Sequence, residues 1–261
     1  MRYMLFFLLL AIPLFSEIKK IHLLSEIPIE EFSEMTLTLF DIDDVLIYPK
    51  DALLQNWRSA WKPEGMRGWT PEEDTIAWMS AKFQILDPLG PELLQLLQDR
   101  KIPTIGFTAF ALEGKASESV PKWRSQHLRE LSLHFRSEEK ILFPFSNEFP
   151  PSFQEGVLYC GDIYKNDNDN KGKILALYLD ALDWIPEQIV LIDDSHKNLL
   201  SVQKELNKRE IHFFGFHYIP KELDPIDEKI AHLQYMTLIE QKKWLSDQEY
   251  SASVKTEQDI F

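Results

Sequence analysis

The stretch Thr36-Leu-Thr-Leu-Phe-Asp-Ile-Asp-Asp-Val45 decides the fold, because it joins a strand-forming run to a group of acids. Residues 36–40 are β-branched, aromatic or aliphatic and leave little polar surface, which is typical of a parallel strand buried on both faces. Open α/β sheets bind their ligands at the carboxyl ends of such strands. The sequence therefore predicts that Asp41 and Asp43 lie at a ligand site.

Asp41 and Asp43 also suit a two-step displacement at phosphorus. A carboxylate at a strand end can attack phosphorus and form an aspartyl-phosphate, which divides hydrolysis into two easier steps. An acid two residues later can protonate the leaving oxygen and then deprotonate water. The pair alone is a weak signal, because most such pairs are solvated loop acids or helix caps, so a functional interpretation needs support from later segments of the chain.

Two later segments supply groups that can hold a phosphoryl group. Residues 103–107 read as a second strand, after which the Thr108 hydroxyl and the Ala109 amide can bind phosphate oxygens. Lys171 stands at the start of a predicted helix, where its ammonium can offset charge on the nucleophile and on the transferred group. Lys173 is the alternative for this lysine.

A third segment supplies metal ligands. Asp193 and Asp194 end the strongly apolar strand predicted over residues 188–192. Hard carboxylate oxygens that converge there with Asp41 favour Mg²⁺, which keeps some waters and one substrate oxygen in its shell.

Taken in order, these motifs resemble the haloacid dehalogenase (HAD) superfamily, over about residues 36–216. That resemblance implies a doubly wound, Rossmann-like parallel α/β sheet and a Mg²⁺-dependent phosphohydrolase. It makes Asp41 the nucleophile, Asp43 the general acid and base, and Lys171 the catalytic lysine beside the phosphate-binding Thr108 and Ala109.

The metal ligands implied by the resemblance are Asp41, the main-chain carbonyl of Asp43, and an acid of the later pair. A sugar-phosphatase-like alignment favours Asp194 as the direct ligand and Asp193 behind it. Asn198 falls where many members have an outer acidic residue, a departure that could weaken the metal site. The acid at Asp43 is typical of the phosphatase branch of the superfamily.

The remaining patterns predict the domain organisation. Residues 17–47 and 91–220 form the core, and residues 48–90 form a small helical cap inserted after the first strand, with a capping box at Thr70-Pro-Glu-Glu73. Residues 221–261 form a C-terminal helix and a loose tail. Other helices are expected over 91–101, 117–135, 173–182, 199–206 and 226–245, and other strands over 156–160 and 211–216.

The N-terminus predicts export. Arg2, an apolar run over residues 4–15 and Ser16 describe a signal peptide of residues 1–16, and the run is short for a membrane span. A retained anchor is the alternative. Cys160 is the only cysteine, so no intramolecular disulfide can form. The leader and the motifs together resemble exported bacterial HAD-like proteins, periplasmic or secreted.

Charge and composition restrict the classes of molecule that the protein can bind. The net charge is −14 and no block of lysine and arginine occurs, which disfavours nucleic acid. A small phosphorylated substrate fits the motifs, whereas the oligomeric state stays open. An exported binding or host-interaction protein on the same scaffold and a phosphotransferase are the competing functions. The cap adds candidate substrate contacts at Trp57, Trp61, Trp69, Trp78, Arg58, Lys62, Arg67 and Lys82.

Three further residues or segments are expected to be structural. The acidic turn over residues 167–172 does not fit a calcium loop, because Lys171 and Tyr178 occupy ligand positions. His196 is expected on the surface and Cys160 in the core.

Overall fold

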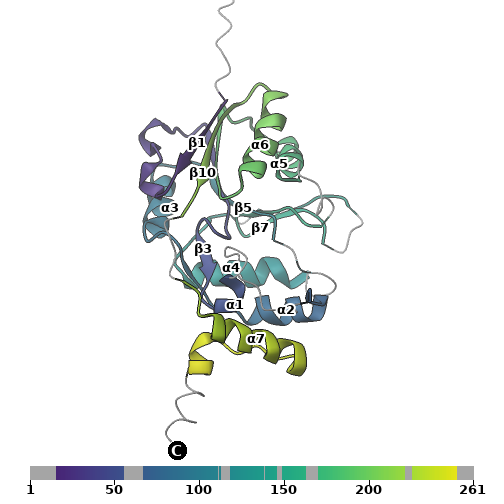
Figure 1. The fold of residues 1–261 in the computed structure, drawn as a ribbon. Coiled ribbons are helices and arrows are strands. Elements are labelled where there is room, and N and C mark those ends of the chain that lie inside the picture. Colours follow the sequence, from purple (N-terminus) through teal and green to yellow (C-terminus); the bar gives the residue numbers. More distant parts are fainter. Residues whose placement is uncertain are drawn as a thin grey trace, which may run out of the picture.

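A central sheet organises the computed structural model, which describes residues 16–55, 67–110, 112, 118–137, 139–145, 149–162, 170–220 and 225–251. Its strand order is β1-β10-β9-β2-β5-β8-β7-β6 (Figure 1). Pairing is parallel from β1 to β8, whereas β7 and β6 add an antiparallel edge. The strands are β1 (Ser16–Ile21), β2 (Thr36–Phe40), β5 (Thr104–Thr108), β6 (Ile141–Leu142), β7 (Ser152–Gln154), β8 (Val157–Tyr159), β9 (Gln188–Asp193) and β10 (His212–Tyr218).

The strand β2 marks the point where the chain changes direction across the sheet. From β2 the chain builds β5 and β8 on one side and then crosses to build β9 and β10 on the other. Phe40 is in register with Gly106 of β5 and with Ile192 of β9. The segments that come after these three strands therefore meet at one edge of the sheet, where open α/β folds bind ligands.

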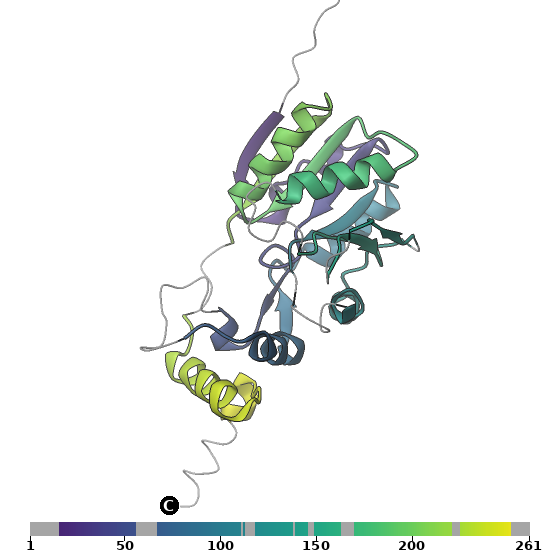
Figure 2. The same cartoon turned by 90° about the vertical axis from the view of Figure 1, so that its right-hand side faces the viewer.

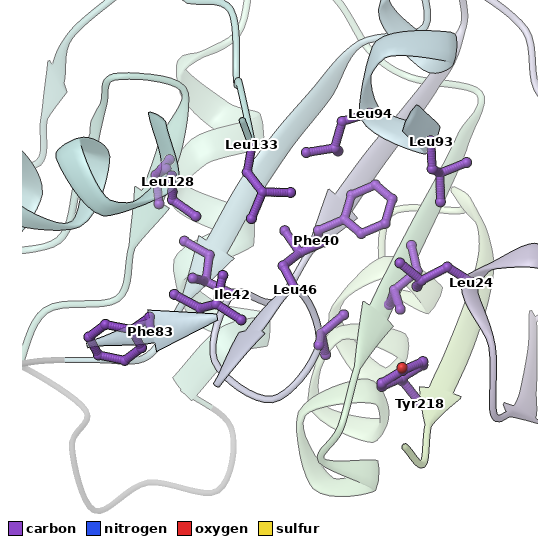
Figure 3. Packing of buried hydrophobic residues seen from close by; sticks show 14 of the residues in the cluster. Leu24, Phe40, Ile42, Leu46, Phe83, Leu93, Leu94, Leu128, Leu133 and Tyr218 are labelled. Atoms are coloured by element: carbon purple, nitrogen blue, oxygen red, sulfur yellow. The ribbon is translucent and has the colours of Figure 1, made fainter. Parts of the chain in front are cut away.

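Helices cover both faces of the sheet: α3 (Gly90–Asp99) lies on one side (Figure 1), and α5 (Asn170–Ala181) and α6 (His196–Asn207) lie on the other, in front of the sheet in Figure 2. Alternate residues of one strand enter different cores: Leu39 packs with helices α5 and α6, and Phe40 packs with α3 and α4 (Figure 3). The expected doubly wound, mostly parallel α/β core is confirmed at this level. The helices of this unit are η1 (Leu24–Glu26), η2 (Ile29–Glu31), α3 (Gly90–Asp99), α4 (Val120–Glu130), α5 (Asn170–Ala181) and α6 (His196–Asn207).

The insert after β2 is more than a helical cap. It leaves and re-enters the core through antiparallel strands β3 (Ile47–Pro49) and β4 (Phe83–Ile85), with α1 (Ala52–Gln55) and α2 (Pro71–Ser80) between them. The strands were not expected, because three residues are too few to show an alternating pattern. The capping box at Thr70 is confirmed: Thr70 and Glu73 exchange hydrogen bonds.

The C-terminal helix α7 (Glu228–Gln241) belongs with this insert and is not a separate appendix. It packs against α1 and α2 (Figure 1), and the Leu53 amide donates to Gln234 at 2.9 Å. The chain after α7 stays packed as far as it is described, since Tyr250 is buried. We call residues 47–55, 67–85 and 225–251 the cap lobe.

Two edges of the sheet differ from the expectation. The predicted cleavage point after Ser16 lies at the start of β1, and the leader residues 1–15 lie outside the described part. Residues 136–155, over which the sequence predicted neither a helix nor a strand, contribute the short strands β6 and β7. Among the described residues, no helix is long and apolar enough to cross a membrane.

Candidate active site

Asp41 directly follows β2 and is buried at the point where the three central strands end. Its main-chain N–H donates to the Ile192 carbonyl at 2.8 Å, which ties it to β9. The Oδ1 atom accepts the Ile42 amide at 2.8 Å and lies 3.0 Å from the Lys171 Nζ. The carboxylate is therefore held by one amide and one ammonium.

Lys171 lies in the first turn of α5 and is buried. Its Nζ donates to Asp193 Oδ2 at 2.7 Å and to the Phe107 carbonyl at 2.8 Å, besides its ion pair with Asp41. Burial disfavours the ammonium, but Asp193 and Asp41 outweigh it and raise the pKa of Lys171 above its ordinary value. Lys171 thus remains a cation across the neutral range.

Gly172 explains how α5 brings Lys171 so deep. A Cβ atom at this position would lie 2.3 Å from the Ser201 carbonyl oxygen of α6. The Gly172 amide instead donates to the Ser201 hydroxyl at 2.9 Å. The close contact between the two helices therefore requires glycine next to the buried lysine.

Asp193 and Asp194 have different surroundings although they are adjacent. Asp193 is fully buried, and its oxygens accept from Lys171, from the Ser195 amide at 2.8 Å and from the Asn198 amide group at 3.0 Å. Asp194 is half-buried. Neighbouring donors therefore engage both oxygens of Asp193, whereas the side chain of Asp194 is more exposed.

The three acids Asp41, Asp193 and Asp194 each offer one oxygen within 4.8 Å of the others. Burial raises the pKa of Asp41 well above its usual range; Asp193 and Asp194 raise it further, and Lys171 opposes them. Among the described residues, three acids here face one lysine. Oxygen donors with excess negative charge fit Mg²⁺.

Thr108 and Ala109 lie at the end of β5, next to β2 in the sheet. Thr108 is buried, and its hydroxyl oxygen accepts the Phe110 amide at 3.0 Å, which fixes the turn after the strand. Ala109 is exposed. The structure thus brings both residues to the edge that carries Asp41, although no hydrogen bond joins either side chain to Asp41 among the described residues.

Asp43 has a partner that the sequence did not suggest. Nη2 of Arg124, from α4, lies 2.9 Å from Asp43 Oδ1 and donates to Oδ2 at 3.1 Å. A signal was present, because Val120, Arg124 and Leu128 recur every four residues on the buried face of α4. An arginine in the middle of an apolar stripe needs a buried acidic partner.

The other candidates fall outside this cluster or outside the described part. Cys160 is buried, and burial raises its thiol pKa to about 12, as expected for a core residue. His196 is exposed, with its ring 5.5 Å from that of His217. Arg67 pairs with Glu73 inside the cap lobe. Two candidate lysines differ in exposure: Lys173 is half-buried on α5, and Lys82 is exposed. Two tryptophans of the cap lobe, Trp69 and Trp78, are partly buried. The remaining candidates lie outside the described residues; they are Trp57, Arg58, Trp61, Lys62 and the turn over residues 163–169.

Comparison with known proteins places the chain in a family. Residues 17–251 match the family described as "Protein of unknown function (DUF2608)". The chain belongs to the DUF2608 family. The match begins one residue after the start of β1 and ends at residue 251, the last residue of the cap lobe, so the family includes both the core and α7.

Relatives of this DUF2608 protein occur in two groups of bacteria. A "Putative outer membrane protein" of Chlamydia trachomatis is 29% identical over 88% of this chain and 89% of its own length. A protein of the same name from Chlamydia muridarum is 28% identical over 90% and 92%. "Uncharacterized protein RP296" of Rickettsia prowazekii is 24% identical over 82% and 81%. No solved structure matches the chain at a significant level.

Proposed function

We propose that this DUF2608 protein is a Mg²⁺-dependent phosphomonoester hydrolase of the HAD type, which acts through an aspartyl-phosphate on Asp41. One observation carries the proposal: Lys171 is buried at the strand ends and pairs with both Asp41 and Asp193. A buried cation that two acids share at a ligand-binding edge can stabilise the negative charge that develops during phosphoryl transfer.

In the first step, Asp41 attacks phosphorus, so that an Oδ–P bond forms as the bond from phosphorus to the leaving oxygen breaks. Asp43, in its protonated form, gives its proton to the leaving oxygen. Lys171 lies against Asp41 and offsets negative charge on the acyl phosphate as it forms. Bound Mg²⁺, held by Asp41, Asp194 and the Asp43 carbonyl, would neutralise charge on the phosphoryl oxygens.

In the second step, Asp43 takes a proton from water while the water oxygen attacks phosphorus. The bond between phosphorus and Asp41 breaks, and inorganic phosphate leaves. Asp43 has then regained the proton that it gave away, and Asp41 is again a carboxylate. Thr108 and the Ala109 amide would hold the phosphoryl oxygens in both steps.

The direct test is phosphate release by residues 17–261. We expect hydrolysis of p-nitrophenyl phosphate that requires Mg²⁺ and stops with a chelator. Asp41→Asn removes the nucleophile with almost no change in volume, so turnover should fall to background while the fold survives. Asp99→Asn, an exposed acid on α3, is the matched control. Wild-type turnover in Asp41→Asn would rule out this mechanism.

The two adjacent acids predict different metal responses. Asp194→Ala should raise the Mg²⁺ concentration needed for half-maximal activity, because it removes the better-placed ligand. Asp193→Ala should lower the melting temperature more, because it removes buried partners of Lys171, Ser195 and Asn198. Metal titration of activity and thermal denaturation of both variants separate the effects. Equal metal dependence would mean that both acids share the ion.

The chlamydial relatives' names favour a location outside the cytoplasm, in line with the predicted leader. We therefore propose that the protein is exported, periplasmic or secreted, after cleavage behind Ser16. A binding role at the cell envelope is the second candidate function, favoured by the same names. Absence of turnover across a panel of phosphorylated metabolites would favour it.

A further inference from the structure

We propose that Arg124 is the positioning residue for Asp43, and that an aromatic collar shared by the core and the cap lobe holds Arg124 in place. The proposal rests on the proposed function, since it concerns the residue assigned to proton transfer. It adds to the site a residue that lies outside the motifs of Asp41, Thr108, Lys171 and Asp193.

The first observation is the burial of the guanidinium. The Arg124 side chain is 0% exposed, whereas the Asp43 side chain is 20% exposed. Only Nη2 reaches Asp43, and Nε and Nη1 have no hydrogen-bond partner among the described residues. A buried guanidinium with most donors unused is costly for folding alone, so a role at Asp43 explains its presence better than packing does.

The second observation is the aromatic collar around the guanidinium. The Arg124 Cζ lies 4.6 Å from the ring centre of Trp123, 4.7 Å from Phe110 and 5.1 Å from Phe83. Phe83 comes from β4 of the cap lobe, and Phe110 follows β5 in the core. Trp78 of α2 extends the collar through an edge contact with Phe110 at 5.3 Å.

The collar gives Arg124 what a positioning residue needs. Aromatic faces attract the guanidinium and restrict its rotation. Nη2 donates to Oδ2 of Asp43 and lies 2.9 Å from Oδ1, which has no hydrogen-bond partner among the described residues, so Oδ1 can carry the proton while Oδ2 still accepts from Arg124. The Asp43 carboxyl group is thus held in one orientation, directly before the turn in which Asp44 has a φ of 66°.

Substitution of Arg124 should therefore reduce kcat by a factor that depends on the leaving group of the substrate. An alkyl phosphate needs protonation of its leaving oxygen, whereas p-nitrophenyl phosphate leaves as a stable anion and needs much less. If Arg124 positions Asp43, Arg124→Met should reduce kcat on ethyl phosphate at least tenfold more than on p-nitrophenyl phosphate, within the roughly 10²–10⁴-fold worth of acid–base catalysis. A purely structural role would reduce both rates equally.

The control lies on the same helix. Arg129 is 52% exposed and pairs with Glu155, so Arg129→Met removes the same charge from α4 without reaching Asp43. We expect equal, small changes on both substrates. In an Asp43→Asn background, Arg124→Met should add no further selectivity, because the group that it positions is already absent.

Chemical rescue provides a separate readout. Arg124→Ala opens a buried space between the rings, and millimolar guanidinium should restore turnover of ethyl phosphate, whereas urea, which is uncharged and of similar shape, should not. If neither variant folds, Arg124→Lys keeps a cation in the collar and should show a smaller loss with the same selectivity. Uniform losses on both substrates in the folded variants overturn the role of Arg124 alone. A wild-type protein that hydrolyses neither substrate overturns the proposed function, and this role with it.

Discussion

Two buried acids, Asp41 in the core and Glu73 in the cap lobe, are held in opposite ways. Glu73 is fully buried at the start of α2. It accepts two hydrogen bonds from Arg67, at 2.6 and 2.8 Å, another from the Thr70 amide at 2.8 Å, and an ion pair from Lys242. Asp41 has one ammonium and one amide beside it, together with two further acids.

This difference separates a structural charge from a functional one. Hydrogen bonds, first those from Arg67, hold the pKa of Glu73 far below its usual value. Burial moves the pKa of Asp41 in the opposite direction. A carboxylate whose partners fully compensate it stabilises the fold, whereas one left with excess negative charge around it is suited to receive a cation or a phosphoryl group.

The largest expected effect tests the ionic cluster of the core. Lys171→Met leaves Asp41 and Asp193 buried without their ammonium, next to the half-buried Asp194. Removing one partner from a buried ionic cluster costs about 3–5 kcal/mol, or roughly 10 °C in melting temperature for a chain of this size. Thermal denaturation in a chelator checks this, and Mg²⁺ should restore part of the loss.

Lys173→Met is the matched control, since the sequence allowed either lysine to be the catalytic one. It lies two residues further along α5 and is half-buried. We expect a smaller loss of stability than for Lys171→Met, because the side chain of Lys173 is only half-buried. Equal melting temperatures for the two variants would mean that the core acids do not depend on Lys171.

A smaller effect concerns the pH dependence of stability without metal. Because the folded pKa of Asp41 lies above its unfolded value of about 4, the folded state binds more protons than the unfolded state in that window. Stability from this group is therefore full below about pH 4 and falls as the pH rises through the folded pKa.

In Asp41→Asn, this decrease in stability with rising pH should be absent. At pH 7 in a chelator the variant should be more stable than the wild type, and the difference should shrink toward pH 4. Mg²⁺ should reverse the order, because the variant loses a ligand. Urea denaturation at several pH values checks both statements, and parallel curves for the two proteins would contradict the excess charge around Asp41.

The sequence predicted the core site because strand ends are local patterns. An apolar run followed by acids places Asp41 and Asp194 at the same sheet edge, since parallel strands share their carboxyl ends. The same logic placed Lys171, whose helix start is visible in the chain. The spacing on α4 indicates that Arg124 is buried, but it does not identify Asp43 as the partner, because tertiary packing joins these two positions 81 residues apart.

The cap lobe was predicted less completely for a related reason. Strands β3 and β4 have only three residues each, so neither offers a long apolar pattern. Outside the cap lobe, the edge strand β1 of the central sheet is interrupted by charged residues and offers no such pattern either. The packing of α7 on α1 depends on single side chains such as Gln234, which a sequence pattern does not distinguish from a solvated glutamine.

The smallest expected effect tests the cap side of the comparison. Glu73→Gln keeps an acceptor for the Thr70 amide but removes the charge that pairs with Arg67 and Lys242, whose side chains can still reach solvent. We expect a loss of about 1.5–3 kcal/mol at pH 7, the usual worth of a hydrogen bond to a charged group. Glu72→Gln, the exposed neighbour in the same turn, is the control and should change little.

The pH dependence of that loss has a fixed sign. Because the folded pKa of Glu73 is depressed, its contribution is full above the unfolded value of about 4.3 and is lost as the pH falls below it. The wild type and Glu73→Gln should therefore converge in stability below about pH 4, which is the reverse of the trend for Asp41. Hydrogen exchange in α2 and α7 should report the loss locally, while hydrolysis of p-nitrophenyl phosphate stays nearly unchanged. If Glu73→Gln and Glu72→Gln unfold alike at pH 7, the buried charge of the cap lobe contributes nothing, and the contrast with Asp41 fails on that side.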